Sequence, residues 1–247
     1  MLAPYNRFVP YIANLLLAAA ELATAQSCHS DAHASIASVR LQKHVEVLAD
    51  DSFEGREAGT RGGRAAAGYL VQCLQQWGLT PAGENESYFQ NFDHGFRNVL
   101  AEIKANNSPQ TSGTIVVCGH YDHVGLGNRT NSYGPIGLIH NGADDNASGV
   151  AALLELARCL VRLRSSLQKN VLFIFWDGEE RGLLGSRYWL KQPTVPLDQV
   201  DLVINADMIG RLRQKRLEVL GTRSAFHLRQ LVSRQNLDSQ LKIDFIW

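Results

Sequence analysis

Residues of the types that bind metal ions follow three apolar runs of the sequence, at 114–118, 171–176 and 202–205. A fourth acidic group directly precedes an apolar segment with helical spacing. These metal-ligand residue types are His120, Asp122, Asp144, Asp145, Asp177, Glu179, Glu180 and Asp207. Because open α/β sheets bind ligands beyond the carboxyl ends of their strands, we expect the four groups to meet at one edge. Aspartate and glutamate avoid a protein interior unless they are paired or bind a cation, so the sequence predicts a metal site.

The residue types also limit which metal the site would bind and which reaction it could support. Imidazole together with carboxylates favours zinc, manganese or cobalt over calcium or magnesium. The spacing of His120 and Asp122 allows the carboxylate to orient the imidazole. The adjacent Glu179 and Glu180 allow one carboxylate to bind a metal while the other acts as a general base beside a metal-bound water. Each pattern alone is common on surfaces, in turns or at helix N-termini, so only their joint occurrence is specific.

Four motifs carry a resemblance to a known family. They are Gly-His-Tyr-Asp-His at 119–123, Asn-Gly-Ala-Asp-Asp-Asn-Ala-Ser-Gly at 141–149, the segment 177–186 and the segment 205–211. Together they resemble the secreted bacterial di-zinc aminopeptidases that include leucyl aminopeptidase and aminopeptidase Y. Glutamate carboxypeptidase II and glutaminyl cyclase are more distantly similar. The resemblance extends from about residue 45 to about residue 225.

The resemblance implies a set of zinc ligands. His120 and Asp207 would bind one zinc, Glu180 would bind a second zinc, and Asp144 would bridge the two. In this family the peptide bond that would correspond to Asp144–Asp145 is often cis. Zinc, two ions in a complete site, is therefore the implied cofactor.

The resemblance also implies the reaction. Glu179 would deprotonate a water that attacks the scissile carbonyl and would then pass the proton to the leaving amine. Asp122 would orient His120. The implied activity is that of a metallo-aminopeptidase, which hydrolyses N-terminal residues from peptides, and peptides are the implied partners.

One ligand of the family pattern has no counterpart here. The second zinc of the family also takes a histidine well downstream of the last motif, whereas His227 is the only histidine after Asp207 and follows it by 20 residues in a predicted helix. We therefore expect a chain truncated at the C-terminus, with one zinc site incomplete. The sequence leaves two alternatives: an inactive or single-metal homologue, and a one-zinc relative that cyclises N-terminal glutamine. His123 and His140, which flank the motifs, could line the pocket, but packing within loops is the expected role.

The elements that position these residues alternate along the chain. Strands are predicted at 99–103, 114–118, 171–176, 202–205, 217–220 and 243–247, and helices at 36–50, 60–77, 146–164, 182–190 and 224–234. Continuous apolar strands are typical of a sheet covered on both faces. The alternation predicts an α/β fold, a three-layer sandwich with a mostly parallel mixed sheet flanked by helices. We expect one catalytic domain at 26–247.

The N-terminus has the order of a secretory signal. Arg7 precedes an apolar stretch at 11–20, which is followed by small residues at 23–25. Such a stretch is too short to span a bilayer comfortably. We therefore predict a signal peptide at 1–25 and a secreted or periplasmic protein; a short N-terminal helix or a misassigned start codon is the alternative.

Composition excludes some functions. The chain has 24 basic and 24 acidic residues, so it has no electrostatic reason to bind nucleic acid or an anionic membrane. The four cysteines have no Cys-x-x-Cys spacing, which argues against a structural zinc site. Buried free thiols are expected, although export would allow a disulfide. Side-chain preference and oligomeric state are not encoded in any pattern of the sequence.

Overall fold

The computed structural model describes residues 36–105, 113–131 and 134–246. The predicted signal peptide at 1–25 lies outside the described residues, so secretion stays a prediction. No helix within these described ranges is long and apolar enough to cross a bilayer.

Six strands form one mixed sheet, in the order β1-β3-β5-β4-β6 with β2 paired to β3. The strands are β1 (Thr80–Pro81), β2 (Phe89–Phe92), β3 (Phe96–Ile103), β4 (Thr114–His120), β5 (Asn170–Trp176) and β6 (Val200–Asn205). The three strands β5, β4 and β6 run parallel, and β3 is antiparallel to β5. The carboxyl ends of the parallel strands therefore meet at one edge of the sheet, where the predicted metal ligands follow.

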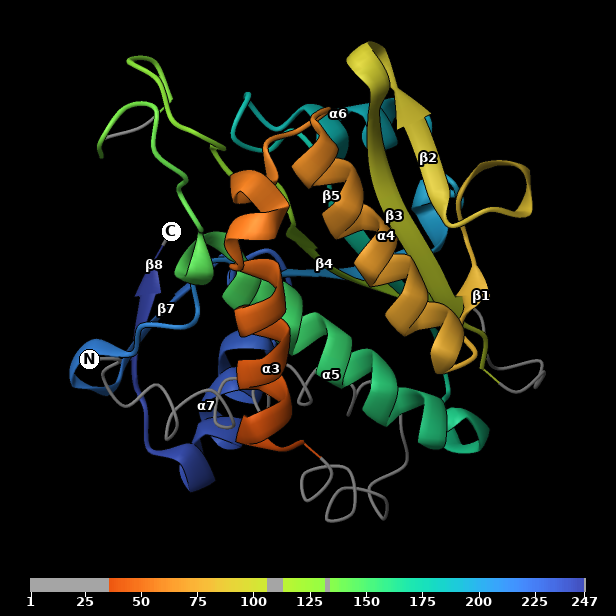
Figure 1. Ribbon diagram of the computed structural model, residues 1–247. Helices are drawn as coiled ribbons and strands as arrows, with labels where there is room; N and C mark the ends of the chain where they lie inside the picture. Colours follow the sequence, from red (N-terminus) through yellow and green to blue (C-terminus); the bar gives the residue numbers. More distant parts are fainter. Residues whose placement is uncertain (1–35, 106–112, 132–133, 247) are drawn as a thin grey trace.

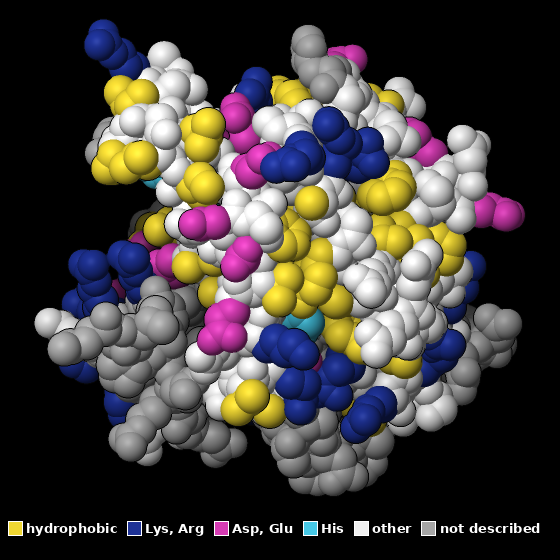
Figure 2. All heavy atoms as spheres, viewed as in Figure 1, with side chains coloured by type: hydrophobic (Ala, Val, Ile, Leu, Met, Phe, Trp, Pro, Cys, Tyr) yellow, Lys and Arg dark blue, Asp and Glu magenta, His cyan; other side chains and the backbone are white. Residues whose placement is uncertain are grey.

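Helices cover both faces of this sheet, as predicted for a three-layer α/β sandwich. They are α3 (Ser38–Leu48), α4 (Arg61–Gln76), α5 (Gly149–Arg162) and α6 (Leu184–Lys191). Figure 1 shows α3, α4 and α5 together in front of one face. On the opposite face, Trp189 of α6 packs on Trp176 of β5 with ring centroids 5.9 Å apart. Figure 2 shows basic and acidic side chains interspersed among apolar atoms on the face formed by α3 and α4.

Local sequence explains the central elements. Every residue of β4 is buried, as expected for a strand with apolar side chains on both faces. Thr60 is the N-cap of α4, because its hydroxyl oxygen accepts a hydrogen bond from the Gly63 amide at 3.3 Å. These elements fix the ends of the strands from which the site residues extend.

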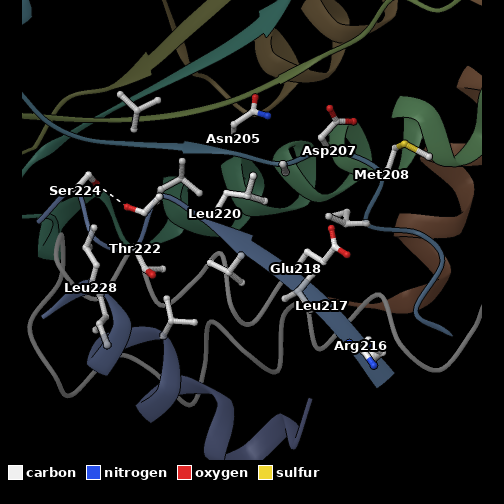
Figure 3. Close-up of a pocket in the computed structure, with 18 of the residues that line it drawn as sticks. Asn205, Asp207, Met208, Arg216, Leu217, Glu218, Leu220, Thr222, Ser224 and Leu228 are labelled. Carbon is white, nitrogen blue, oxygen red and sulfur yellow. Dashed lines mark hydrogen bonds between the residues drawn. The ribbon is translucent and has the colours of Figure 1, made fainter. Parts of the chain in front are cut away.

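A second, two-stranded sheet lies beside β6. It pairs β7 (Arg216–Leu220) with β8 (Lys242–Ile246) in parallel, and α7 (Leu228–Ser239) connects them. A groove of about 930 Å³ separates β6 from β7 and α7. Figure 3 shows Asp207 and Met208 at one end of this groove, with Leu217 and Glu218 of β7 across from them.

The outer edge of β6 generates a prediction. Among the described residues β6 pairs only with β4, and its Val203 is 54% exposed. An open apolar edge favours pairing between molecules, and a lysine there opposes it. Val203→Lys is therefore expected to slow aggregation, followed by light scattering, while changing the free energy of unfolding by less than about 0.5 kcal/mol.

Val39→Lys is the matched control, because Val39 is 71% exposed but lies on helix α3. If both variants slow aggregation equally, net charge rather than the β6 edge is responsible.

Candidate metal centre

Three site residues converge from the ends of β4 and β6 and the turn before α5. His120 is the last residue of β4, Asp207 follows β6, and Asp145 lies in the π-helical turn Ala143–Ser148. The His120 Nε2 atom is 3.2 Å from Asp145 Oδ1 and 3.3 Å from Asp207 Oδ1. The His120 side chain is only 3% exposed, whereas the two carboxylates reach solvent. The imidazole thus forms the floor of a cluster that opens outward.

A second cluster shares Asp145. The His123 Nδ1 atom is 2.7 Å from Glu180 Oε1 and 3.9 Å from Asp145 Oδ2. The two oxygens of Asp145 therefore face different clusters: Oδ1 faces His120 and Oδ2 faces His123. In each cluster the three potential ligand atoms lie within 4.8 Å of one another.

The structure places Asp145, rather than the predicted Asp144, in both ligand clusters. Asp144, which was predicted to bridge the metals, joins neither cluster among the described residues. Its Oδ1 accepts a hydrogen bond from the Gly210 amide at 2.8 Å, and its Oδ2 lies 3.6 Å from Arg211 Nε. Asp144 therefore fastens the loop after Asp207, and Asp145 lies between the two clusters. The cis peptide bond is Asp145–Asn146 rather than Asp144–Asp145.

Asp122 contacts both His120 and the turn that carries Glu179 and Glu180. Its carboxylate is 3.7 Å from His120 Nδ1, and that ring nitrogen also lies 3.1 Å from the Asp122 carbonyl oxygen. The carboxylate accepts hydrogen bonds from the backbone amides of Glu179 at 3.0 Å and Glu180 at 3.3 Å. Asp122 thus lies against the imidazole and also holds the turn that carries both glutamates.

Glu179 lies at the carboxyl end of β5 and is partly buried. Burial raises the pKa of Glu179, and the charges of Asp122, Glu180 and Asp207 raise it further, while His120 opposes the shift. A carboxylate with a raised pKa is a better proton acceptor, which suits a general base.

A buried arginine joins the loops of the site. The Arg56 side chain is fully buried and donates hydrogen bonds to the carbonyl oxygens of five residues. The acceptors are Leu48, Tyr121, Asn141, Gly142 and Asp145, at 2.6–3.4 Å. Burial lowers the pKa of Arg56 to about 10, against the attraction of nearby carboxylates. Sequence reasoning missed this residue, because nothing in the pattern Gly-Arg-Glu shows that its side chain turns inward.

Asn146 joins the strand ends in a similar way. Its side-chain nitrogen donates to the carbonyl oxygens of His120 and Ala206, at 3.3 and 3.0 Å. Its side-chain oxygen accepts from the amides of Met208 and Gly149, each at 3.1 Å. One buried side chain therefore ties β4, β6 and α5 together directly beside Asp145.

The charge balance of the first cluster suits a cation. Burial opposes protonation of His120, but hydrogen bonds with Asp122, Asp145 and Asp207 outweigh it and raise its pKa to about 12. The carboxylates thus hold a positive charge at the imidazole. Zinc bonds of about 2.0–2.1 Å in tetrahedral geometry place ligand atoms roughly 3.4 Å apart, close to the observed 3.2 and 3.3 Å. These residues therefore fit a zinc ion.

The remaining candidates lie apart from the two clusters. His140 contacts the Pro135 carbonyl oxygen at 2.7 Å within its own loop. His227 is exposed at the start of α7, with its Nδ1 2.8 Å from the Gln230 side-chain oxygen. Three cysteines are free and buried, as predicted: Cys73, Cys118 and Cys159. Cys28 lies outside the described residues.

Comparison with known proteins places the chain in a family. Residues 98–242 match Peptidase family M28, and the chain belongs to this family. It is similar to a probable leucine aminopeptidase of Arthroderma otae, with 27% identity over 76% of this chain and 49% of that protein.

Solved structures share the fold. The LapA aminopeptidase of Legionella pneumophila superposes with a TM-score of 0.65 at 18% identity, over 90% of this chain and 58% of that one. The glutaminyl cyclase of Bacteroides thetaiotaomicron superposes with a TM-score of 0.56 at 20% identity, over 84% of this chain and 83% of that one. The chain spans about half the length of the curated relatives it matches.

The position of Asp145 between the clusters generates a second prediction. Asp145→Asn removes charge from both clusters and is expected to lower zinc affinity at each by at least about 10-fold. Titration calorimetry with zinc measures both affinities. Asp144→Asn is the matched control, because an asparagine oxygen still accepts from the Gly210 amide and Asp144 contacts neither cluster. A larger loss in Asp144→Asn would return the bridging role to Asp144.

Arg56 generates a third prediction. Arg56→Lys keeps the charge but lacks the fork that serves five carbonyl oxygens, so buried acceptors lose their donors. The free energy of unfolding should fall by about 2–5 kcal/mol, measured in urea. Arg61→Lys is the control, since Arg61 is exposed and pairs only with Glu54 among the described residues, and it should have little effect. Equal losses in the two variants would contradict a special role for Arg56.

Proposed function

We propose that this chain carries the metal-binding core of a zinc-dependent aminopeptidase, which hydrolyses N-terminal residues from peptides. The observation that supports this function best is the pair of ligand clusters joined by Asp145, with Glu179 on the adjacent turn. Membership of Peptidase family M28 and the aminopeptidase names of its relatives support the same reaction. Two zinc ions are the proposed complement, one for each cluster.

Zinc in such a pair supplies positive charge that polarises a carbonyl group and lowers the pKa of water. The first ion would be held by His120, Asp145 and Asp207. The second would be held by Asp145 and Glu180 at least. Both clusters contain imidazole and carboxylate groups, the donor set that zinc favours in hydrolytic sites.

Glu179 and Asp122 have the remaining roles in the reaction. Glu179 accepts the proton of the attacking water and then delivers it to the nitrogen of the leaving amine. The Asp122 carboxylate accepts hydrogen bonds from the backbone amides of Glu179 and Glu180 and so holds both residues in place. The side chain of Glu180 would bind metal, while that of Glu179 stays free.

Glu179→Gln tests the function. The amide cannot accept a proton, so hydrolysis of an aminoacyl-p-nitroanilide by zinc-loaded protein should fall by about 10²–10⁴-fold. Zinc content should stay unchanged, since Glu179 belongs to neither cluster among the described residues. The exposed Glu86→Gln in the turn Glu84–Glu86 is the control and should retain full activity.

Three results would contradict the proposal. Hydrolysis that survives Glu179→Gln would remove the glutamate from the mechanism. A zinc-loaded protein that releases ammonia from glutaminyl peptides but no p-nitroaniline would instead be a glutamine cyclase. A protein with neither activity would be an inactive homologue.

A further inference from the structure

The second cluster contains His123, which was expected from the sequence to pack within a loop. His123 lies three residues after the end of β4, on the loop that carries Asp122, and its Nδ1 lies 2.7 Å from Glu180. We infer that His123 supplies a nitrogen ligand of the second zinc site, together with Glu180 and Asp145. This inference rests on the proposed function, because it completes the metal pair described there. His123 follows His120 by three residues, whereas the family resemblance implies a zinc-binding histidine well downstream of Asp207.

The backbone of His123 is held in position. Its amide donates a hydrogen bond to the Arg56 carbonyl oxygen at 3.2 Å, and its loop forms an isolated parallel bridge with Glu57. Arg56 in turn fastens Tyr121 and Asp145, on the two sides of the cluster, through their carbonyl oxygens. The loop that carries the imidazole and the turn that carries the shared carboxylate are therefore bound to the same buried side chain.

The ring of His123 is also confined. Gly142 adopts a left-handed conformation with a φ of 57°, and a Cβ atom there would lie 2.5 Å from His123 Cδ2. The ring therefore packs directly on the Gly142 backbone, where a larger residue would displace it. Only 13% of the His123 side chain is exposed, so the imidazole is directed into the cluster rather than into solvent.

The donor set fits zinc. One imidazole and two carboxylates make three protein ligands, and catalytic zinc sites use three such ligands with a fourth position for water or substrate. The His123 Nδ1 distances to Glu180 and Asp145, 2.7 and 3.9 Å, lie on either side of the roughly 3.4 Å that tetrahedral zinc requires. The alternative is a simple hydrogen bond between His123 and Glu180, which needs no metal.

Zinc binding separates these two readings. Wild-type protein should bind two zinc ions per chain, measured by mass spectrometry of the metal after gel filtration. His123→Ala should retain one ion and weaken the other by at least about 100-fold in calorimetry. His140→Ala is the matched control, since His140 contacts Pro135 within its own loop and should retain both ions. One zinc in wild type, or two equally tight ions in His123→Ala, would overturn the inference.

Two further measurements guard against a folding defect. His123→Gln keeps a side-chain donor for Glu180, so a purely structural hydrogen bond predicts recovery of zinc binding, whereas a ligand role predicts continued loss. In wild-type protein, saturating zinc should protect His123 from carbethoxylation by diethylpyrocarbonate, quantified by peptide mapping, and should leave His140 reactive. Equal modification of His123 with and without zinc would overturn the inference without any variant.

The outcomes distinguish this inference from the proposed function. A wild-type protein that binds two zinc ions through His123 but hydrolyses no peptide would contradict the aminopeptidase function alone. A protein that hydrolyses peptides and keeps both ions in His123→Ala would contradict the role of His123 alone.

Discussion

The site depends first on the buried guanidinium of Arg56. Five carbonyl oxygens from separate segments accept its hydrogen bonds, so the segments around 48, 121 and 141–145 are fixed relative to one another. Unpaired buried carbonyls are costly, which makes this arrangement difficult to replace. The charge of Arg56 also lies near the carboxylates of Asp122, Asp145 and Glu180, whose mutual repulsion would otherwise oppose their convergence. The Arg56 side chain thus both fixes the positions of these segments and offsets the repulsion between the carboxylates.

The same crowding of carboxylates gives the site its affinity for positive charge. His120 holds a proton up to a pKa of about 12 because three aspartates contact it, even though burial opposes the charge. Asp145, despite its burial, has a lowered pKa because His120, His123 and Arg56 stabilise its charged form. A metal ion at the cluster takes over the role of that proton. Binding of zinc therefore competes with protonation of His120, and the cluster is arranged for a cation in either case.

Much of the fold could be predicted because the central strands are continuous apolar runs, and β4 and β5 begin within one residue of their expected positions. The strands β1 and β2 were missed because they are short, and Gln90 and Asn91 give β2 no apolar alternation. The ligand residue types could be predicted because they follow the strands in the sequence. The choice between Asp144 and Asp145 could not be predicted, because adjacent side chains point in different directions and only the backbone geometry decides which one joins the clusters. His123 was missed for a related reason: its partners Glu180 and Asp145 are distant in sequence.

The ligand candidates all lie in one part of the sequence. All members of both clusters lie between His120 and Asp207, and the residues that hold them, Arg56 and Asn146, also precede β7. The segment that forms β7, α7 and β8 contributes walls to the groove beside β6 but no member of either cluster within the described residues. The later segment thus forms one wall of the groove, whereas Asp207, a member of the first cluster, lies on the other wall.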